Sequence, residues 1–479
     1  MPIVAMKQGV AKTLRAKGHY IKQASKERSA FRLVKSLQMN QKSIDKGKVR
    51  DFQRKIYLKA KQEKNFRFYV LHDKIRDERF LKEAYRRVKA NKGSPGVDGK
   101  SFEEIEAGGI DAFIEEIRKE LKEETYVPKP VLRTYIMKAN GKMRPLGIPT
   151  IKDRVIQMSC KLVIEPIFEA DFVKSSYGFR PKKSAKNAIE EIKHNLISGK
   201  TEILDADLSQ YFDTIPHDKL MKVIAERISD SKVLSLVKKW LKCPVSEKGK
   251  ISGGKKSKEG TPQGGVISPL LANAYLHMMD RIISKSGGRY ERAGVKIVRY
   301  ADDFVVMGEN LSTEIINDIK RIISKLGLRL NEEKTKVDKA KESSFDFLGF
   351  TMRYSKCRFK IGNKYWTITP SKKSEKEVRK KLSEQMEKDR NTSKNILVKH
   401  LNEKIRGWTN YFRIPKVTTT WKSFNSLSYY TAIKLEAYFK KKSQRRSKLA
   451  NHKAYRVLVD KFGLIDASKL RNSLNPVNV

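Results

Sequence analysis

The chain has 479 residues with 104 Lys and Arg against 54 Asp and Glu, so its formal charge is +50. A hydrophobic content of 39% supports a folded core and excludes a wholly disordered chain, while the absence of any run of about 18 apolar residues argues against a membrane span. Three widely separated cysteines exclude a disulfide scaffold or a Cys-rich zinc module, and the excess positive charge indicates a polyanionic partner such as RNA or DNA.

The predicted elements of the first half of the chain mix helices with strands. Apolar residues recur at helical spacing over residues 71–90, and Lys92–Gly96 supplies the Gly and Pro that end this helix. An alternating β-rich run at 131–138 and the segment 143–149 flank Asn140-Gly141, a pair that favours a hairpin turn. The same patterns predict further helices at 111–122 and 154–170 and a short strand at 202–208.

The second half begins with two predicted helices between residues 218 and 242, followed by a Gly- and Lys-rich segment, 248–260, that we expect to be a loop. A helix is predicted from Ser268-Pro269, because proline is favoured in a first helical turn. Two β-rich runs between 295 and 307 meet at Ala301–Asp303. A helix at 312–326, a strand, and helices beyond 371 complete a mixed α+β chain with an all-helical, basic end.

The positive charge is concentrated at the two ends of the chain. Residues 1–70 hold 19 basic and 4 acidic side chains, and residues 371–479 hold 27 basic and 9 acidic side chains. We interpret these ends as polyanion-binding regions; the alternative is two solvated tails. In 371–479 the interleaved aromatic residues favour a folded core or stacking on bases.

The first 26 residues contain no acidic side chain, as in some organelle transit peptides. Lys exceeds Arg there, however, and the basic composition continues well beyond residue 26. We therefore expect a bacterial cytoplasmic protein rather than an organellar one.

Acidic residues interrupt two of the predicted strands. Asp302 and Asp303 lie between apolar β-rich runs, where an ordinary exposed turn is the alternative interpretation. Asp205 and Asp207 give a second strand an acidic end. Carboxylates from separate strands can hold two divalent ions about 3.5–4 Å apart, as in-line nucleotidyl transfer requires. Mg²⁺ is the expected ion because it prefers oxygen ligands and phosphate partners.

Tyr300–Asp303 resembles the YxDD box of reverse transcriptases, and its neighbours appear in the expected order. These neighbours are Arg144–Pro149, Tyr177–Pro181, the Asp207 strand, Gly260–Gly265, Gly327–Asn331 with Glu333–Thr335, and Phe347–Phe350. Lys92–Gly99 is similar to a block upstream of the fingers, and Ile405–Phe412 resembles a maturase-specific thumb signature. Over roughly residues 71–440, the chain therefore resembles the group II intron-encoded reverse transcriptases/maturases.

This resemblance implies a right-hand polymerase fold. Residues 71–370 would form the fingers and a palm with an antiparallel sheet, and residues 371–440 an all-helical thumb or maturase domain. Residues 1–70 would be a basic extension and residues 441–479 a basic tail, either a reduced DNA-binding segment or a solvated helix end. The tail has one His and no Cys, so we expect no nuclease module of the family's His- and Cys-bearing kind and no cleavage of a second DNA strand.

The resemblance also implies an activity and its partners. The enzyme would be an RNA-directed DNA polymerase that also binds its intron RNA as a splicing maturase. Its partners would be template and intron RNA, a DNA primer or target, and dNTPs. Two other functions stay open. A mainly RNA-binding splicing factor is one, although such proteins lose the metal-binding acids that this chain keeps. A related enzyme outside an intron, in host defence or repair, is the other.

The resemblance assigns the reaction centre residue by residue. Asp207, Asp302 and Asp303 would be catalytic and would hold two Mg²⁺ ions, with Mn²⁺ as a substitute. Phe212, five residues after Asp207, occupies the family's steric-gate position, where an aromatic edge would clash with a ribonucleotide 2′-hydroxyl. Asp205 and Asp213 would play supporting parts. The other residues expected to bind the dNTP are Lys138, Arg144, Gln263, Gly264 and Lys334.

Contacts with template or other RNA are expected from basic and aromatic side chains. Arg180 is expected to contact the template, with bracing of the fingers as the alternative. The remaining expected RNA contacts are Arg406, Trp408, Tyr411, Lys440, Arg445 and Arg446.

Overall fold

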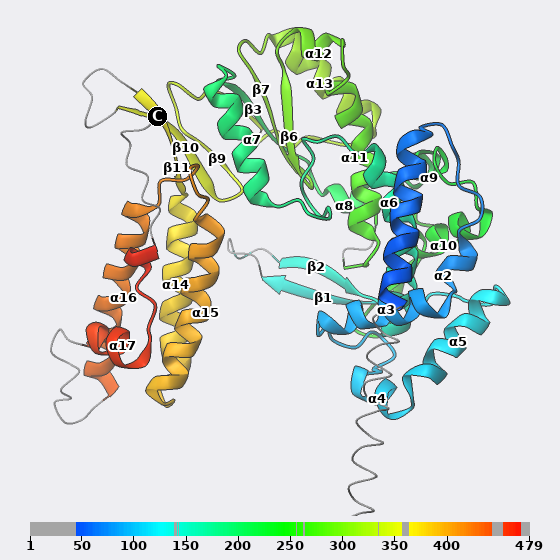
Figure 1. Ribbon diagram of the computed structural model, residues 1–479, viewed down its shortest axis with the longest axis horizontal. Helices are drawn as coiled ribbons and strands as arrows, with labels where there is room; N and C mark the ends of the chain where they lie inside the picture. The colour runs from blue at the N-terminus through cyan, green and yellow to red at the C-terminus, as the bar shows by residue number, and fades with distance from the viewer. Residues whose placement is uncertain are drawn as a thin grey trace, which may run out of the picture.

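The computed structural model describes residues 45–137, 141, 143–254, 256–261, 264–333, 335–356, 364–442 and 454–470. Five of the predicted site residues lie outside the described residues: Lys138, Gln263, Lys334, Arg445 and Arg446. The described chain is a mixed α+β fold that ends in helices, as the sequence predicts. Figure 1 shows its arrangement, with α14–α17 at one end of the molecule and α2–α6 at the other.

The N-terminal part of the described chain is helical. A helix runs through residues 45–62, and it is followed by α2 (His72–Ile75), α3 (Glu78–Ala90), α4 (Phe102–Ala107), α5 (Ile110–Lys122) and, after two strands, α6 (Ile151–Asp171). The single helix predicted at 71–90 is wrong, because the chain breaks between α2 and α3. Asp77 is extended there, and its side chain accepts a hydrogen bond from the Arg79 backbone N–H, which caps α3.

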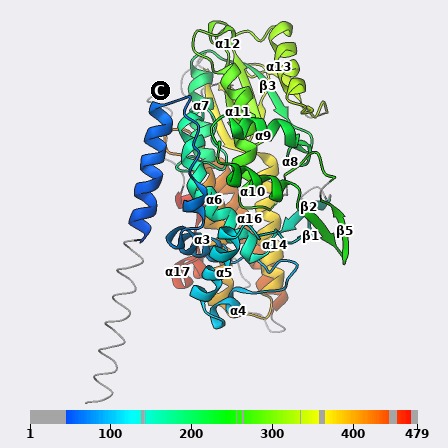
Figure 2. The same ribbon diagram turned by 90° about the vertical axis from the view of Figure 1, so that its right-hand side faces the viewer.

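The helix through residues 45–62 belongs to the folded body. The Gln53 side chain donates a hydrogen bond to the Leu162 carbonyl (2.8 Å), and Val49 and Ala60 are buried in the core. Part of the segment expected as a basic extension is therefore integrated into the fold. Figure 2 shows this helix on the opposite side of the molecule from β1, β2 and β5.

Four strands form a sheet of order β2-β1-β4-β5: β1 (Val131–Met137), β2 (Met143–Ile148), β4 (Pro244–Glu247) and β5 (Lys250–Gly253). β1 and β2 are antiparallel, as the predicted hairpin requires. The loop predicted at 248–260 is wrong in its first part, which holds β5. Lys248 and Gly249 have φ angles of 48° and 81°, so they make the tight turn that pairs β5 with β4.

The central sheet is antiparallel and has the order β6-β7-β3-β8, with β3 (Glu202–Asp207), β6 (Lys296–Tyr300), β7 (Asp303–Gly308) and β8 (Lys336–Lys339). Side chains alternate between its faces. Leu204, Phe304 and Val306 belong to one hydrophobic core, while Ile203 and Val305 belong to a second one. The sheet is therefore buried on both faces.

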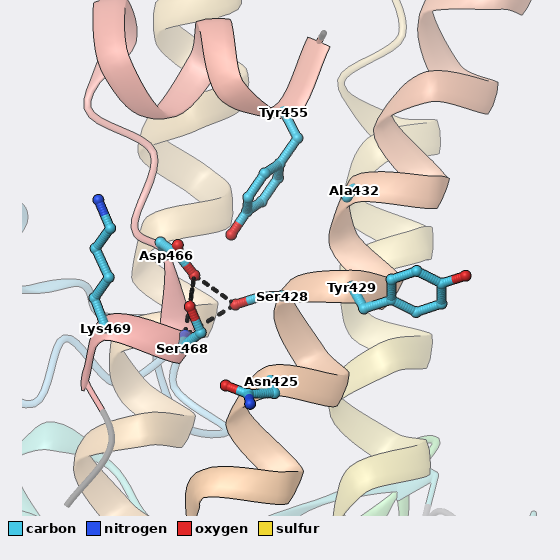
Figure 3. Close-up of a pocket in the computed structure, with 8 residues that line it drawn as sticks. All are labelled: Asn425, Ser428, Tyr429, Ala432, Tyr455, Asp466, Ser468 and Lys469. Carbon is cyan, nitrogen blue, oxygen red and sulfur yellow. Dashed lines mark hydrogen bonds between the residues drawn. The ribbon is translucent and has the colours of Figure 1, made fainter. Parts of the chain in front are cut away.

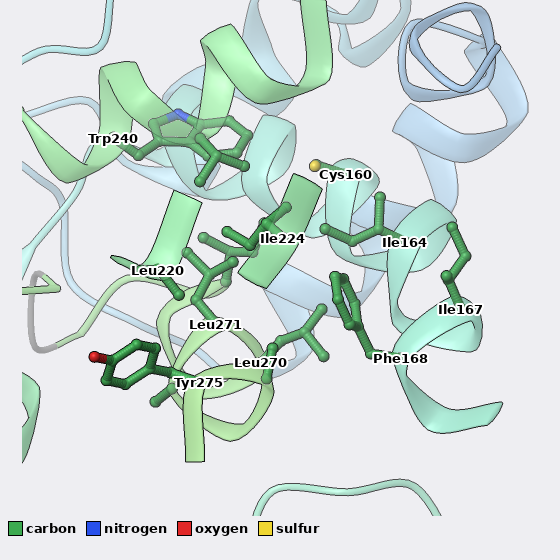
Figure 4. Close-up of a cluster of buried hydrophobic side chains, with 14 of the residues drawn as sticks. Cys160, Ile164, Ile167, Phe168, Leu220, Ile224, Trp240, Leu270, Leu271 and Tyr275 are labelled. Carbon is green, nitrogen blue, oxygen red and sulfur yellow. The ribbon is translucent and has the colours of Figure 1, made fainter. Parts of the chain in front are cut away.

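This part of the chain holds the helices α7 (Ala185–Ile197), α8 (Tyr211–Thr214), α9 (His217–Ala225), α10 (Ser231–Leu241), α11 (Ser268–Ile283), α12 (Arg289–Arg292) and α13 (Thr313–Lys325). Of these, α7 and α11 contact β6 of the central sheet, and α9 and α12 pack on α11. Figure 4 shows the first core, where α6, α9, α10 and α11 meet through side chains such as Phe168, Ile224, Trp240 and Leu271. The second core includes Ile189 and Ile192 of α7.

The C-terminal part combines a third sheet with four helices. The sheet has the order β11-β10-β9, from β9 (Phe345–Phe347), β10 (Phe350–Lys356) and β11 (Lys364–Pro370). The helices are α14 (Lys372–Lys388), α15 (Lys394–Phe412), α16 (Trp421–Lys442) and α17 (Ala454–Phe462), followed by the 3₁₀ turn η1 (Ala467–Leu470). One strand was predicted between 326 and 371, and the structure has four, counting β8.

The segment expected as a C-terminal tail also contributes to the core. Ala454, Leu458, Leu464 and Ala467 are buried in the second hydrophobic core. The prediction of a separate tail beginning at residue 441 is therefore wrong for residues 454–470, because their apolar side chains pack on the helices before them.

Phe350 joins the third sheet to the C-terminal helices. Its side chain is fully buried, and its ring centroid lies 4.7 Å from that of Phe412 on α15. We predict that Phe350→Ala lowers the free energy of unfolding by about 3–5 kcal/mol, because it leaves a cavity at this junction. Urea denaturation measures the loss, and Tyr429→Ala, at a side chain that is 71% exposed, is the matched control. Equal, small losses in both variants would contradict the prediction.

Candidate active site

The acidic residues at the strand ends meet in the central sheet. Asp207 ends β3 and Asp303 begins β7, and the two are direct partners in the antiparallel ladder. Because side chains alternate along a strand, Asp205 and Asp207 share the face of Ile203. The structure thus brings together acids that are almost 100 positions apart in the sequence.

A large cleft opens beside this acidic edge. It has a volume of about 1270 Å³. The central sheet contributes Asp205, Asp207 and Asp303 to its lining, the turn between β9 and β10 contributes Leu348, and α14 and α15 supply the opposite wall. That wall carries apolar, basic and acidic side chains: Lys373, Glu377, Lys381, Glu403, Lys404, Trp408 and Tyr411. The acidic strand ends therefore face a wall of mixed charge that includes three lysines.

Asp302 occupies the turn between β6 and β7, next to Ala301, which has a left-handed φ of 59°. Burial raises the pKa of Asp302, and the nearby Asp207 carboxylate raises that pKa further. Arg144, on β2, is close enough to act in the opposite direction. The predicted residues Asp207, Asp302 and Arg144 are thus neighbours, although they come from three different strands or turns.

The carboxylates at the strand ends are suited to a metal ion that takes part of its coordination shell from water or phosphate oxygens. Within the described ranges, no cluster of three or more His, Cys, Asp or Glu side chains is arranged to hold a metal ion. Asp207, Asp302 and Asp303 therefore do not form a ready three-carboxylate cage. Mg²⁺ usually takes only one or two protein carboxylates and fills its shell with water and phosphate oxygens. The pair Asp207 and Asp302 fits that requirement.

Asp205 lies in an unusually negative environment. Burial and, after it, the carboxylates of Asp303, Asp338, Asp207 and Asp346 raise the pKa of Asp205 to about 6. Its carboxyl group therefore titrates close to neutral pH, unlike an ordinary aspartate.

A neighbour of Asp207 that sequence reasoning left without a role is Asn331. Its backbone N–H donates to the Asp207 carbonyl (2.8 Å), and its side-chain amide lies 3.4 Å from a carboxylate oxygen of Asp207. The Ser209 N–H donates to the Arg329 carbonyl (2.9 Å) in the same place. These contacts hold the end of β3, and the position of Asn331 within the Gly327–Asn331 block was the available signal.

Gly264 allows two backbones to meet. It has a φ of 111°, and a Cβ at this position would lie 2.1 Å from the Gly147 carbonyl oxygen on β2. The sequence placed Gly264 among the residues expected to bind the dNTP. The structure shows that the close approach is to the β2 strand that carries Arg144.

Phe212 lies in the short helix α8, partly buried against the first core. Its backbone carbonyl accepts a hydrogen bond from the Thr261 N–H at 2.6 Å. Thr261 is thus held to Phe212, while Gly264 lies against β2, the strand that carries Arg144.

Arg180 is an exception among the predicted site residues. Its guanidinium pairs with Glu169 at 2.9 Å and donates to the carbonyls of Val173 and Ser176, and its side chain is only 5% exposed. The guanidinium is thus directed into the fold, where it holds Glu169 and the chain at Val173–Ser176. The template contact of Arg180 stays a prediction.

The predicted RNA-contacting residues near the C-terminus differ in their positions, because some line the cleft and others are exposed on the helices. Trp408 and Tyr411 line the cleft, and the Tyr411 hydroxyl donates to the Leu348 carbonyl at 3.0 Å, so these aromatics also join α15 to the third sheet. Arg406 on α15 and Lys440 on α16 are exposed. All four are therefore available in the described chain, two of them at the cleft.

A second cavity, of about 720 Å³, lies among α16, α17 and η1 (Figure 3). Its polar centre is Asp466, whose carboxylate accepts hydrogen bonds from the hydroxyls of Ser428 and Ser468, both at 2.7 Å. Burial opposes this charge, but the hydrogen bonds lower the pKa of Asp466 overall. This carboxylate serves to join η1 to α16, so the acidic cleft is the better candidate for chemistry.

Two known protein families match this chain. Residues 129–352 match the family described as "Reverse transcriptase (RNA-dependent DNA polymerase)", and residues 375–456 match "Group II intron, maturase-specific domain". The chain is thus a reverse transcriptase domain followed by a helical maturase-domain region. It belongs to the group II intron reverse transcriptase/maturase family, as the sequence motifs indicated.

Individual proteins are similar to parts of this chain. "Protein YkfC" of Escherichia coli (strain K12) is 36% identical over 347 residues, which are 65% of this chain and 90% of the relative. "Group II intron-encoded protein LtrA" of Lactococcus lactis subsp. cremoris is 37% identical over 257 residues, 53% of this chain and 40% of LtrA. Among solved structures, a "Partial Cas6-RT-Cas1--Cas2 complex" chain matches at 21% identity with a TM-score of 0.33, over 53% of this chain and 42% of that one.

The helices give no sign of a membrane segment. In the described part of the chain, none combines the length and the apolar character that crossing a bilayer requires.

The raised pKa of Asp205 predicts a pH-dependent effect of Asp205→Asn. A carboxyl group whose folded pKa is raised stabilises the fold at low pH, and this contribution is lost as the pH rises through about 6. At pH 8 the variant lacks a charge that the wild type must bury among other acids. We expect its Tm to be higher than that of the wild type by about 2–4 °C at pH 8 and nearly equal at about pH 3.5, below the unfolded pKa of 3.8.

Thermal denaturation at the two pH values tests this prediction. Asp111→Asn is the control, because Asp111 is 85% exposed and contacts only Lys82 among the ion pairs of the described chain. The same change in Tm at both pH values would show that Asp205 is not titrating as inferred.

Proposed function

We propose that the chain is an RNA-directed DNA polymerase with a right-hand architecture. The central sheet would be the palm, and the helices before it together with the β2-β1-β4-β5 sheet would be the fingers. The helices α14–α16 would be the thumb, and the division near residue 370 follows the start of α14. The cleft between the acidic strand ends and α14–α15 has the position that a template–primer duplex would occupy.

One observation carries this proposal: Asp302 is close enough to both the Asp207 carboxylate and the Arg144 guanidinium for each of them to shift its pKa. Asp207 and Asp302 would hold Mg²⁺, with Asp303 adjoining them in the ladder. Mg²⁺, when bound, lowers the pKa of an attacking 3′-hydroxyl and neutralises charge on the triphosphate and leaving group. Arg144 would bind the triphosphate from the fingers side.

Other residues would position the substrates. Phe212 would exclude a ribonucleotide by contact with its 2′-hydroxyl, from a place that the Thr261 hydrogen bond fixes. Gly264 and its neighbours would form one wall of the nucleotide pocket. Arg406, Trp408 and Tyr411 on α15 would contact the duplex backbone from the thumb, without reading its sequence.

The chain would also bind intron RNA as a splicing maturase. The maturase-specific match at residues 375–456 coincides with the basic C-terminal region, where residues 371–479 hold 27 basic and 9 acidic side chains. Such an excess of cations favours binding to RNA phosphates.

The retained acids Asp207 and Asp302 favour an active enzyme over a purely RNA-binding splicing factor. A related enzyme acting outside an intron, in defence or repair, would show no intron RNA domains flanking its gene.

The proposal predicts that Asp302→Ala abolishes DNA synthesis. Loss of this carboxylate should reduce primer extension on an RNA template with dNTPs and Mg²⁺ by about 100-fold or more, because it removes several kcal/mol of charge stabilisation. Binding of the RNA should be unchanged, since the basic surfaces remain.

A gel assay of primer extension and a filter-binding assay measure the two effects. Asp111→Ala, at an exposed site on α5, is the matched control and should extend primers like the wild type. Extension that survives Asp302→Ala would refute the assignment of the reaction centre.

A second prediction concerns sugar selection by Phe212. Phe212→Ala should raise the incorporation of ribonucleotides relative to deoxyribonucleotides by about tenfold or more, because it opens space for the 2′-hydroxyl. Single-nucleotide incorporation with matched rNTP and dNTP measures the ratio. Phe66→Ala, another Phe partly buried against the same core, controls for general loosening. An unchanged ratio would mean that Phe212 is only a packing residue.

A further inference from the structure

Arg299, three residues before Asp302 on β6, is the largest fully buried side chain of the described structure, with an exposure of 0%. Its charge is balanced by Asp280 of α11, which is 1% exposed. The Arg299 Nε donates to both carboxylate oxygens of Asp280, at 2.9 and 3.0 Å. Sequence patterns assign no role to either residue, because a single basic residue in a strand or a single acid in a helix is common in proteins.

The rest of the guanidinium reaches three different segments. Nη1 donates to the Asn273 side chain on α11 (2.9 Å) and to the backbone carbonyl of Ala301 (2.8 Å). Nη2 donates to the Ser176 hydroxyl at 2.8 Å. Arg299 thus joins α11, the segment before α7 and the turn that carries Asp302.

The turn is held from its other side as well. A Cβ at Gly178 would lie 2.3 Å from the Ala301 nitrogen, so only glycine permits this approach. The Asn273 side chain donates to the Gly178 carbonyl at 2.8 Å, and the Tyr177 N–H donates to the Arg299 carbonyl at 2.8 Å. Ala301 is therefore enclosed between the Arg299 guanidinium and the Gly178 backbone.

Such an arrangement is a costly way to obtain stability alone. Replacing a buried ion pair with apolar residues of similar volume is often neutral or stabilising for the fold. A buried pair is therefore better explained where it specifies one conformation. The conformation specified here is unfavourable by itself, because Ala301 is an L-residue with a φ of 59°. The Ala301 carbonyl begins the peptide unit that leads to Asp302, so its direction sets the direction of the Asp302 side chain.

We infer that Arg299 is a positioning residue for the polymerase reaction, which holds the left-handed turn at Ala301 so that the Asp302 carboxylate faces Asp207. This inference rests on the proposed function. Arg299 acts through Asp302 and has no contact with substrate. Asp280, Asn273 and Ser176 are the partners that keep its guanidinium in place.

The test is Arg299→Lys in the full-length protein. A lysine keeps the charge beside Asp280 but cannot reach Ser176, Asn273 and Ala301 at once. We expect kcat for primer extension to fall by about 100-fold, because a shift of about 1 Å in a reacting group has that effect. KM for dNTP and affinity for primer–template should stay within about twofold. Mn²⁺ should also bind more weakly to the complex of the variant with primer–template and dNTP. Electron paramagnetic resonance measures this binding without depending on activity.

Ala301→Gly separates positioning from simple core packing. Glycine adopts the left-handed conformation without cost. In the Arg299→Lys background, Ala301→Gly should therefore recover about tenfold in kcat, since the unfavourable conformation no longer needs the guanidinium. A residue needed only for folding would show no recovery. Arg289→Lys, at an exposed arginine that pairs with Glu314 and Asp318, is the matched control and should keep wild-type kcat.

Asn273→Ala provides a second variant if Arg299→Lys does not fold. It removes the contacts at 2.9 and 2.8 Å to Arg299 and Gly178 but leaves the ion pair, and it should lower kcat with KM unchanged. If a folded variant, Arg299→Lys or Asn273→Ala, keeps the kcat and the Mn²⁺ affinity of the wild type, the inference about Arg299 is overturned. The proposed function would still stand in that case, because the wild-type protein extends primers. Absence of extension by the wild-type protein would instead overturn the proposed function.

Discussion

The antiparallel pairing of β3 with β7 is the constraint on which the rest of this structure depends. Its register places Asp207 opposite Asp303, and the same register sends Leu204 and Phe304 into one core and Ile203 and Val305 into the other. A slip of one residue would exchange the two faces of the strand and turn Asp205 and Asp207 toward the core that Leu204 now occupies. Because both faces of the sheet are covered, the register is strongly specified.

The second physical theme is the placement of negative charge in a very basic protein. The chain carries +50, yet Asp205, Asp207 and Asp303 line one side of the cleft, and burial with neighbouring carboxylates raises the pKa of Asp205 to about 6. Repulsion among these acids is unfavourable for folding. Under the proposed function it is useful, because divalent cations would relieve it, and the lysines of α14 and α15 would neutralise the phosphates of a nucleic acid in the same cleft.

Much of the fold could be predicted because its elements have strong periodicity and clear ends. The hairpin at β1–β2, the strands that meet at Asp302 and the helix that starts at Ser268 are where the sequence placed them. The failures have physical reasons. Asp77 caps a new helix inside an apolar pattern, and Lys248-Gly249 turns a hydrophilic segment into a strand pair. Residues 454–470 follow the basic cluster at residues 440–448, but a few apolar side chains tie them to the core.

The sequence by itself determined the class of partner, through its charge, and the family, through motifs that keep their order along the chain. It also made Asp207 and Asp302 candidate metal ligands, because acids inside apolar strands are unusual and these two match the motifs of the family. Only the tertiary structure decided which side chains contact and hold one another. It buried Arg180 against Glu169, and it brought Arg299, Asn273 and Gly178 around one strained turn. Such contacts join segments up to about 120 positions apart, and local sequence pattern carries no information on pairings at that separation.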